Sequence, residues 1–398
     1  MTVMFYSHDS YGLGHLRRTL TLARFFRASR PLLSQLIVTG SPLAHRFELP
    51  SGTDFIKLPS VVKVGAERYE SRILPMSFLA IRELRREMLL SAARHFQPRT
   101  LVVDNVPRGL KGELVSTLRY LKDASCRLIL GLRDVVDEAG WVRHAWEADG
   151  SFELLDDVYD QIVVYGRREV YDVVDEYGFS SAAAEKTRFV GYLLGEGGVR
   201  RSEEIRAELG VEGRPLVLVM AGGGGDGREL LGAVLEAISL RSDGPDFSCV
   251  LVGGPLMPPD DRRRVLELVA ERPFVRYVDF VEDVGSYIAA ADVIVSMGGY
   301  NSVTEVLAAH KSAIIVPRIS PRREQLIRAE AMSRRGLLRM IHPAELTPRR
   351  LLAEMERCLE LPEELRQRPM PKRLAAAPAD LDALLVEPRA ASVAGIGG

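Results

Sequence analysis

The chain has 398 residues, 46% of them hydrophobic and 27% charged, and its 53 basic and 54 acidic residues leave a net charge of −1. This balance is typical of a soluble globular protein and argues against general binding to nucleic acid. The length predicts two domains of similar size. The three cysteines lie far apart, which indicates neither a disulfide framework nor a zinc site and favours a cytoplasmic location.

Residues 1–194 alternate short runs rich in Val, Ile and Leu with longer segments of helical period. These runs are VMFYSH at 3–8, QLIVTG at 35–40, TLVVDN at 100–105 and QIVVYG at 161–166, among others. Continuous apolar runs are typical of parallel strands that helices cover on both faces. We therefore predict an α/β, doubly wound, Rossmann-like domain over 1–194.

The motif YGLGHLRR at 11–18 follows the first predicted strand and opens a predicted helix. Gly12 and Gly14 let the backbone approach a ligand closely, and His15 stands where the helix begins. A helix N-terminus favours the neutral imidazole that a general base needs. From these residues alone, His15 is a helix-start residue bonded to its own loop, a phosphate contact or a catalytic base.

A second helix is predicted over 77–96, with a stripe of apolar residues from Phe78 to Ala92 and with Arg82, Arg85 and Arg86 largely outside it. A basic amphipathic helix either packs on its own sheet or docks on a membrane. We favour packing and keep membrane association as the alternative. No run of about 18 apolar residues predicts a membrane span.

The segment 133–157 follows a predicted strand of the N-terminal domain and carries two tryptophans and several polar side chains. Trp141, Trp146, Asp134 and His144 are candidates for contact with a second substrate. As an alternative, the aromatic side chains fill the core.

After the glycine-rich stretch 195–198 the alternation begins again, which predicts a second Rossmann-like domain over 195–385. The last residues, 386–398, have little to bury and are predicted to form a disordered tail. In the new domain MAGGGGDGREL at 220–230 follows a predicted strand and opens a helix. Its candidate ligand-binding glycines are Gly222, Gly223, Gly224 and Gly225.

A glycine loop of this kind lets backbone N–H groups and a helix N-terminus reach a phosphate. The next predicted strand, SCVLVGGP, lacks the acidic residue that would hold the ribose of a dinucleotide, and no Gly-Lys-Ser/Thr follows the loop. We therefore favour a nucleoside diphosphate over NAD, with a flexible loop as the alternative.

The segment 295–330 is rich in candidate binding residues. A predicted strand ends at Gly298 and Gly299, and Asn301 with Ser302 can cap the next helix or donate to a phosphate. Glu305 lies about one turn further on, where its carboxylate can accept two ribose hydroxyls. The alternative for Glu305 is a favourable interaction with the helix dipole.

The sequence GYNSVTE at 299–305, followed by Pro317 and then by Glu324 and Gln325, resembles the donor-binding box of the GT-B nucleotide-sugar glycosyltransferases. The resemblance implies two Rossmann-like domains facing across a cleft, with a nucleotide-diphosphate sugar, favoured as UDP-linked, as the donor. It also implies that Gly299, Asn301 and Ser302 meet the diphosphate, that Glu305 meets the ribose, and that Glu324 and Gln325 meet the sugar hydroxyls.

Two features depart from that family's pattern. Met297 stands where those enzymes often have a phosphate-contacting histidine, and the loop RISPRR at 318–323 is longer, with Arg318, Arg322 and Arg323 as further candidates for phosphate. The C-terminal half is also similar to the peptidoglycan N-acetylglucosaminyl transferases. That similarity implies that Phe280 and Val281 contact the base, with core packing as the alternative.

The GT-B resemblance places the first loop of the N-terminal domain against the donor, with Gly12 and Gly14 near it. It implies that His15 deprotonates a hydroxyl of a small-molecule, glycan or lipid-linked acceptor. The same motif resembles the nucleotide-sugar hydrolases of pseudaminic acid synthesis, in which the histidine positions water. Hydrolysis therefore stays open, as does a binding protein without turnover.

No metal and no cofactor are expected. The D-x-D at 380–382 lies near the tail, far from the predicted donor site in sequence. In GT-B chemistry, backbone donors, helix dipoles and arginines can stabilise the departing diphosphate without a metal ion.

Overall fold

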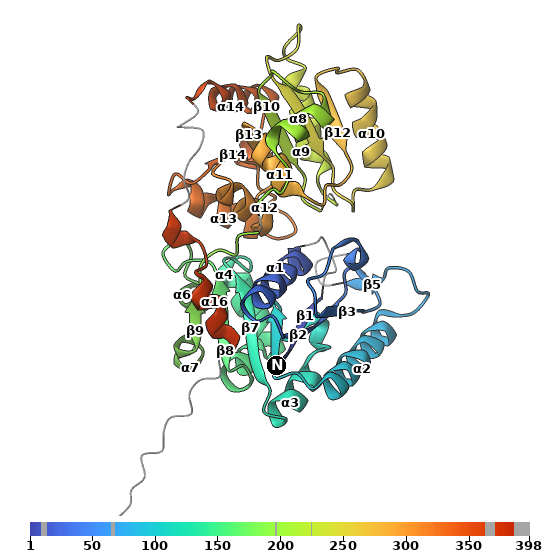
Figure 1. The fold of residues 1–398 in the computed structure, drawn as a ribbon, viewed down its shortest axis with the longest axis vertical. Helices are drawn as coiled ribbons and strands as arrows, with labels where there is room; N and C mark the ends of the chain where they lie inside the picture. The colour runs from blue at the N-terminus through green and yellow to red at the C-terminus, as the bar shows by residue number, and fades with distance from the viewer. Residues whose placement is uncertain (9–13, 65–67, 196, 224, 363–370, 386–398) are drawn as a thin grey trace, which may run out of the picture.

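A computed structural model describes residues 1–8, 14–64, 68–195, 197–223, 225–362 and 371–385. The candidate residues Gly12 and Gly224 and the predicted tail 386–398 lie outside these ranges. Two α/β domains lie one above the other along the long axis of the molecule (Figure 1).

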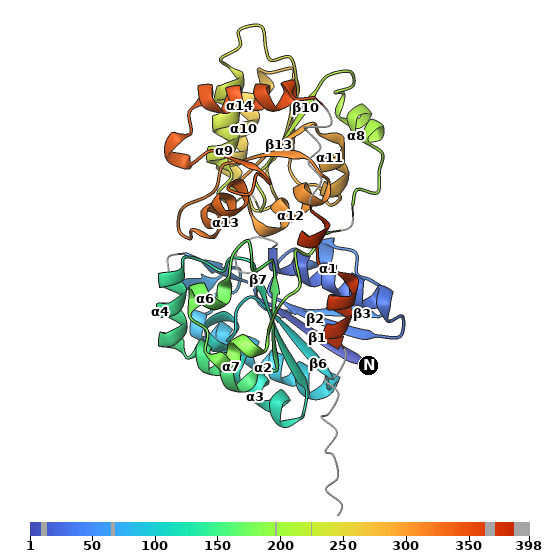
Figure 2. The same cartoon turned by 90° about the vertical axis from the view of Figure 1, so that its left-hand side faces the viewer.

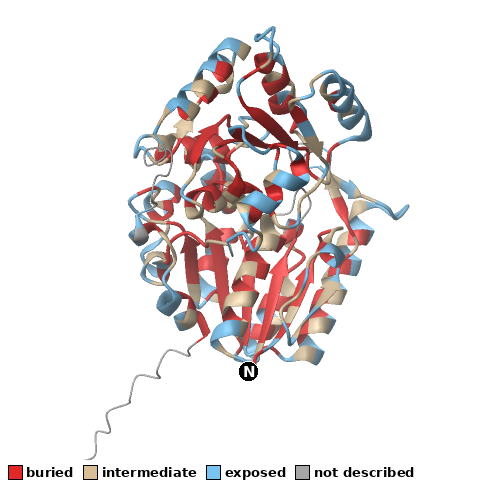
Figure 3. Ribbon diagram, turned by 45° about the horizontal axis from the view of Figure 1, so that its top comes forward, coloured by how far each residue is buried: buried red, intermediate tan, exposed pale blue. Residues whose placement is uncertain are grey.

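The N-terminal domain has a seven-stranded sheet of order β3-β2-β1-β6-β7-β8-β9, with every neighbouring pair parallel. The strands are β1 (Thr2–Ser7), β2 (Ser34–Thr39), β3 (Thr53–Lys57), β6 (Thr100–Asp104), β7 (Arg127–Arg133), β8 (Gln161–Tyr165) and β9 (Thr187–Phe189). A separate antiparallel pair joins β4 (Val61–Lys63) and β5 (Tyr69–Ser71). The central strands are buried on both faces, as their continuous apolar sequence predicts (Figure 3).

Helices cover both faces of this sheet (Figure 2). They are α1 (Gly14–Ser29), α2 (Phe78–Phe96), α3 (Val115–Asp123), α4 (Ala139–Asp149), α5 (Ser151–Glu153), α6 (Val173–Tyr177) and α7 (Ser181–Glu185). The apolar side chains of α1 belong to the core on one face, and those of α2, α3 and α4 belong to the core on the other. The predicted doubly wound architecture is therefore confirmed.

The C-terminal domain has a six-stranded parallel sheet of order β12-β11-β10-β13-β14-β15. Its strands are β10 (Leu216–Met220), β11 (Ser248–Val252), β12 (Val275–Val278), β13 (Val293–Ser296), β14 (Ser312–Ile315) and β15 (Arg339–Met340). Its helices are α8 (Ser202–Leu209), α9 (Arg228–Ile238), α10 (Pro259–Ala270), α11 (Val284–Ala290), α12 (Tyr300–Ala308), α13 (Glu324–Ser333) and α14 (Pro348–Glu360).

Both sheets reverse their strand order once, between β1 and β6 in the first domain and between β10 and β13 in the second. In open α/β sheets, the loops that leave the carboxyl ends of the strands at such a reversal diverge and form a crevice. The start of α1 at Gly14 and the turn at Gly222 therefore lie at the two positions where this architecture binds ligands.

The predicted boundary of the second domain at 385 is wrong for its last segment. After α14 the chain returns to the N-terminal domain, where Tyr192 N–H donates to the carbonyl of Leu374 at 2.8 Å and α16 (Pro378–Asp382) packs against α1. Leu381 and Leu384 are buried in the same core as α1. The apolar surface of the first domain therefore holds this segment, as Figure 2 shows.

Helix α2 also differs from its predicted stripe. Arg85 is fully buried, whereas Leu84 of the predicted stripe is 39% exposed. The Arg85 guanidinium donates from two nitrogens to both carboxylate oxygens of Glu113, each at 2.7 Å, and a third nitrogen donates to the carbonyl of Pro59. These partners satisfy the buried charge, so α2 packs on its own domain through a face that includes an arginine. Across the described ranges, we find no helix with the length and hydropathy of a transmembrane span.

Candidate active site

One cavity lies between the domains and brings together most of the predicted donor residues. Gly14, Arg17, Arg18 and Arg133 line it from the N-terminal domain, and Gly222, Gly223, Gly225, Phe280, Val281, Gly299, Asn301, Ser302, Glu305, Glu324 and Gln325 line it from the C-terminal domain. A second, open hollow lies at the amino ends of β6, β7 and β8, on the opposite edge of the first sheet. Parallel α/β sheets bind ligands at the carboxyl edge, so we place the site in the interdomain cavity.

His15 is not among the residues that line the cavity, but its neighbours Gly14, Arg17 and Arg18 are, and its side chain is 15% exposed. Its Nδ1 lies 2.5 Å from Oδ2 of Asp104, the last residue of β6. Arg18 donates to the same carboxylate from Nε at 3.0 Å and from Nη2 at 2.7 Å. An ionised carboxylate only accepts hydrogen bonds, so this geometry places a proton on Nδ1, and the neutral ring then carries its lone pair on Nε2.

The Asp104 carboxylate stays charged in its buried position. Burial alone would raise the pKa of Asp104, but Arg18 and His15 outweigh it and hold the pKa below its usual value. Nη2 of Arg18 also lies 3.3 Å from Nδ1 of His15, but the shorter contact to the acceptor-only carboxylate decides the tautomer. The three side chains therefore form a fixed unit with His15 at its open end.

Asp104 was missed from the sequence, although a signal was present. It ends the apolar run TLVVD, and β6 pairs directly with β1, with Tyr6 opposite Val103. In a doubly wound sheet, the strand that follows the reversal lies beside the first strand. A polar residue at the end of that strand therefore faces the loop after β1.

A second histidine lies against the first. The rings of His8 and His15 are edge to face with centroids 4.3 Å apart. Burial holds the pKa of His8 well below its usual value, and the nearby arginines, together with His15 when that ring is protonated, lower it further. His8 is therefore neutral and adds no positive charge beside His15.

The phosphate-binding features that the sequence predicts lie at the reversal of the second sheet. Gly222 has a φ of +63°, in the left-handed region that glycine favours, directly after β10. Helix α12 begins at Tyr300, and no side chain caps its N-terminus at Gly299. The first-turn N–H groups of α12 are thus available to an anion. Asn301 instead donates from Nδ2 to the carbonyl of Gly14 at 3.2 Å, across the domain interface.

Gly298 does not line the cavity but supports it. Its φ of +81° and the nearby side chain of Ile315, which a Cβ would meet at 2.6 Å, require glycine at this position. Its carbonyl accepts a hydrogen bond from Nη1 of Arg328. Gly298 therefore positions the loop before α12.

Glu305 forms an ion pair with Arg17 of α1, and the two side chains are 13% and 31% exposed. Burial raises the pKa of Glu305, and the Arg17 charge partly opposes this. The predicted ribose acid is thus in the cavity wall, and its partner comes from the other domain.

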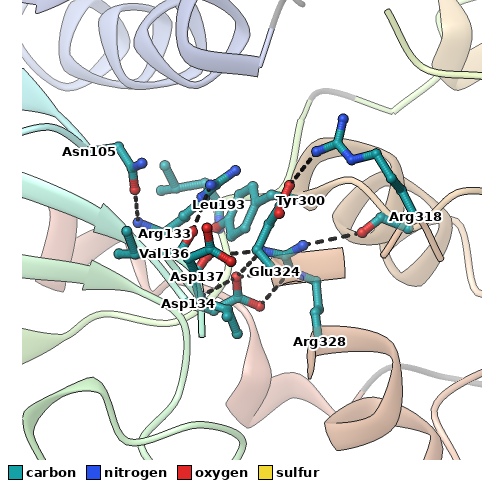
Figure 4. A network of polar contacts seen from close by, with 12 residues as sticks. Asn105, Arg133, Asp134, Val136, Asp137, Leu193, Tyr300, Arg318, Glu324 and Arg328 are labelled. Atoms are coloured by element: carbon teal, nitrogen blue, oxygen red, sulfur yellow. Dashed lines mark hydrogen bonds and ion pairs between the residues drawn. The ribbon is translucent and has the colours of Figure 1, made fainter. Parts of the chain in front are cut away.

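The predicted sugar-contacting pair is also in the wall, held by the loop before α13. Arg318 donates from Nη2 to Oε1 of Glu324 at 2.8 Å and from Nη1 to Asp226 at 2.7 Å, while its backbone N–H donates to Oε1 of Gln325 (Figure 4). The other carboxylate oxygen of Glu324 is buried and has no hydrogen-bond partner. Burial would raise the pKa of Glu324, but Arg133, Arg318 and other cations keep it below its usual value.

The other two arginines of the 318–323 loop lie outside the cavity wall. Arg322 stacks on Trp141 with its guanidinium carbon 4.5 Å from the ring centre, and Nη1 of Arg323 is 3.3 Å from Glu138. The backbone N–H of Arg323 donates to Asp137 at 2.9 Å. These contacts join the two domains on the side of the site away from the glycine loop.

Two candidates for contact with a second substrate are structural instead. Asp134 is buried and accepts from Nε and Nη2 of Arg328, at distances of 2.7 to 2.9 Å, which locks the domains together (Figure 4). Trp146 is 6% exposed and packs among Phe152, Tyr177 and Phe179. Both are buried, so a substrate cannot reach them in this arrangement.

Comparison with known proteins agrees with the geometry. Residues 217–383 match the model of the glycosyltransferase family 28 C-terminal domain. A curated relative in Rubrobacter xylanophilus, UDP-N-acetylglucosamine--N-acetylmuramyl-(pentapeptide) pyrophosphoryl-undecaprenol N-acetylglucosamine transferase, is 33% identical over 158 residues, which are 39% of this chain and 44% of that protein. The chain thus matches less than half the length of this relative.

Solved structures match nearly the whole chain at low identity. The MurG structure from Acinetobacter baumannii covers 96% of this chain and 99% of its own, with a TM-score of 0.58 and 14% identity. The UDP-GlcNAc 2-epimerase from Neisseria meningitidis, bound to UDP-GlcNAc, covers 97% and 99% with a TM-score of 0.62 and 13% identity. These likenesses show the two-domain GT-B fold. They also show that one fold hosts different reactions on nucleotide sugars, so the reaction must be argued from the site.

Proposed function

We propose that the protein is an inverting glycosyltransferase that moves a sugar from a UDP-sugar to a hydroxyl acceptor. The observation that carries the proposal is one cavity with two complementary walls. On one side the start of α1 lines the cavity and holds His15 against Asp104, and on the other side lie Gly222 and Gly223, the uncapped start of α12 and Glu305. The name of the Rubrobacter relative, a UDP-N-acetylglucosamine transferase, supports UDP as the nucleotide.

In this proposal the C-terminal domain binds the donor. The diphosphate lies at Gly222–Gly225 and at the first-turn N–H groups of α12, where backbone donors and the helix dipole favour an anion. Glu305 exchanges Arg17 for the ribose hydroxyls, and Phe280 with Val281 contacts the base. The buried, unpartnered oxygen of Glu324 accepts a sugar hydroxyl, since an unsatisfied buried acceptor is completed by a ligand.

His15 acts on the acceptor. Its Nε2 takes the proton of the acceptor hydroxyl as that oxygen forms a bond to the anomeric carbon. The bond between the anomeric carbon and the β-phosphate oxygen breaks, and UDP leaves with the electron pair. Asp104 stabilises the imidazolium that results and keeps the ring in the tautomer that the step needs. One displacement at the anomeric carbon inverts its configuration.

The charge of the departing diphosphate is balanced by N–H groups and arginine side chains, so the proposal needs neither a metal ion nor a cofactor. The acceptor is a small-molecule, glycan or lipid-linked hydroxyl, and the reaction takes place in the cytoplasm. Hydrolysis, in which water replaces the acceptor, would use the same groups. The following experiment distinguishes hydrolysis from sugar transfer.

The test begins with a panel of UDP-, dTDP- and GDP-sugars, with free nucleotide and free sugar measured after incubation without acceptor. Tight binding of a UDP-sugar with slow release of free sugar supports transfer, and rapid release of one sugar per nucleotide supports hydrolysis. Addition of acceptor classes then identifies the one that accelerates UDP release. His15→Ala should lose that acceleration by about 100- to 10,000-fold, whereas His95→Ala, which changes an exposed histidine near the end of α2, should keep it. Full turnover by His15→Ala would overturn the mechanism.

A further inference from the structure

The cavity and its rim are rich in arginine, and almost every one of these cations is neutralised by a carboxylate. The pairs are Arg17 with Glu305, Arg18 with Asp104, Arg318 with Asp226 and Glu324, Arg322 with Asp137, and Arg328 with Asp134. Arg133 also lines the cavity, but none of the described residues forms an ion pair with it. Arg133 is therefore the exception in a site where charges are otherwise matched.

Arg133 is held in place by its surroundings. It ends β7, its backbone N–H donates to Oδ1 of Asn105 at 3.3 Å, and its Nη2 donates to the carbonyl of Val136 at 2.9 Å. Its Nε is buried and has no hydrogen-bond partner. Burial lowers the pKa of Arg133 to about 10, with nearby cations adding to the effect, so the group is still charged at neutral pH. An unmet donor on a buried cation is costly, and such groups are kept where a ligand completes them.

Glu324 faces the same cavity from the other domain, and one of its oxygens is unpartnered in the same way. Of the charged groups nearby, Glu324 has the largest effect on the pKa of Arg133, and Arg133 has the largest effect on the pKa of Glu324. No hydrogen bond or ion pair joins the two side chains (Figure 4). Arg133 and Glu324 thus line one cavity from opposite domains, and each has one buried polar atom without a hydrogen-bond partner.

We propose that Arg133 binds an oxyanion of the bound donor, either the β-phosphate or a carboxylate carried by the sugar, while Glu324 accepts a sugar hydroxyl beside it. This assignment rests on the proposed function. The planar guanidinium suits both anions, since phosphate and carboxylate oxygens match its N–H groups. Binding the β-phosphate would balance the charge that grows as UDP leaves, and binding a carboxylate would select an acidic sugar.

The experiment measures Kd values of UDP, UDP-glucose and UDP-glucuronate by titration calorimetry for the wild type, Arg133→Gln and Arg133→Lys. If the anion is the β-phosphate, Arg133→Gln weakens all three by about 10- to 100-fold, the range for a hydrogen bond to a charged group. If the anion is a sugar carboxylate, it weakens UDP-glucuronate alone by that factor. Arg133→Lys keeps the charge without the planar donor pattern and should lie between the wild type and Arg133→Gln.

The matched control is Arg143→Gln, which removes an exposed cation from α4 and should leave all three Kd values unchanged. Melting temperatures without ligand guard against misfolding, because the substitution also removes the hydrogen bond from Arg133 Nη2 to the carbonyl of Val136. If Arg133→Gln binds all three ligands as tightly as the wild type does, the oxyanion assignment for Arg133 is wrong, while the proposed function still stands. A wild type that binds none of them would overturn the proposed UDP-sugar function and the assignment together.

Discussion

The sharpest prediction concerns Glu305 and its exchange of partners. Substitution of Glu305 by Gln removes the charge that the proposed function uses to accept two ribose hydroxyls. A hydrogen bond to a charged group contributes about 1.5 to 3 kcal/mol. Before the donor binds, the carboxylate must leave Arg17, whose side chain is 31% exposed, and an ion pair of that exposure contributes at most about 1 kcal/mol.

Subtracting about 1 kcal/mol for the ion pair leaves a net loss of about 0.5 to 2 kcal/mol, or about 2- to 30-fold in Kd for UDP. The assay is titration calorimetry of the wild type and Glu305→Gln with UDP and with its 2′-deoxy analogue. The wild type should prefer UDP, and Glu305→Gln should lose most of that preference, because the group that recognises the hydroxyl is changed. Equal preference in the two proteins would refute the placement of ribose at Glu305.

Three further predictions follow from the same contacts. Asp104→Asn should lower turnover by about 100- to 10,000-fold with little change in donor Kd, because the amide no longer fixes which nitrogen of His15 carries the proton and contacts no donor group. Measurement of kcat and donor Kd checks this, and a loss confined to donor binding would contradict it. Because burial raises the pKa of Glu305, UDP binding should weaken as pH falls through that raised value and protonates the carboxylate, and Glu305→Gln should lack this part of the pH dependence in calorimetric titrations from pH 7.5 to pH 5. Treatment with EDTA should leave the rate of sugar transfer within about twofold, and a rate restored only by added Mg²⁺ would contradict the proposed neutralisation by arginines and N–H groups.

Folding stability should also fall in acid, because of the paired aspartate Asp104. Folding holds the pKa of Asp104 below its unfolded value, so its contribution is complete above the unfolded pKa, near 4, and is lost as pH falls through the folded pKa. In urea unfolding between pH 7 and pH 3, the wild type should therefore lose stability in acid that Asp104→Asn has already lost at pH 7. Parallel pH profiles for the two proteins would contradict this coupling.

The parts of the site that were predictable lie close together in sequence. The glycine loop at 222–225 and the segment from Gly299 to Glu305 each join one strand to the following helix, so short-range sequence fixes their geometry. Glu324 and Gln325 were predicted from the continuation of the same sequence segment, 295–330. The strand runs predicted both sheets because buried parallel strands are apolar on both faces.

The parts that were missed depend on contacts between distant segments. Asp104 meets His15 across 89 residues, and Asp134 meets Arg328 across 194. Sequence periodicity predicts whether a residue lies on a helix or a strand, but it does not predict which distant charged side chain will contact that residue. For the same reason Arg85 was predicted outside the apolar stripe of α2, since its partner Glu113 lies on another segment.

The central claim is that a nucleoside diphosphate binds between the two domains at the reversals of both sheets. Hydrogen–deuterium exchange with and without saturating UDP tests this without knowledge of the acceptor. The account predicts protection of 221–227 and 297–305 in the C-terminal domain and of the start of α1 at 14–18. Protection confined to the hollow at the amino ends of β6, β7 and β8, or no protection at a UDP concentration that a binding assay shows to be saturating, would contradict it.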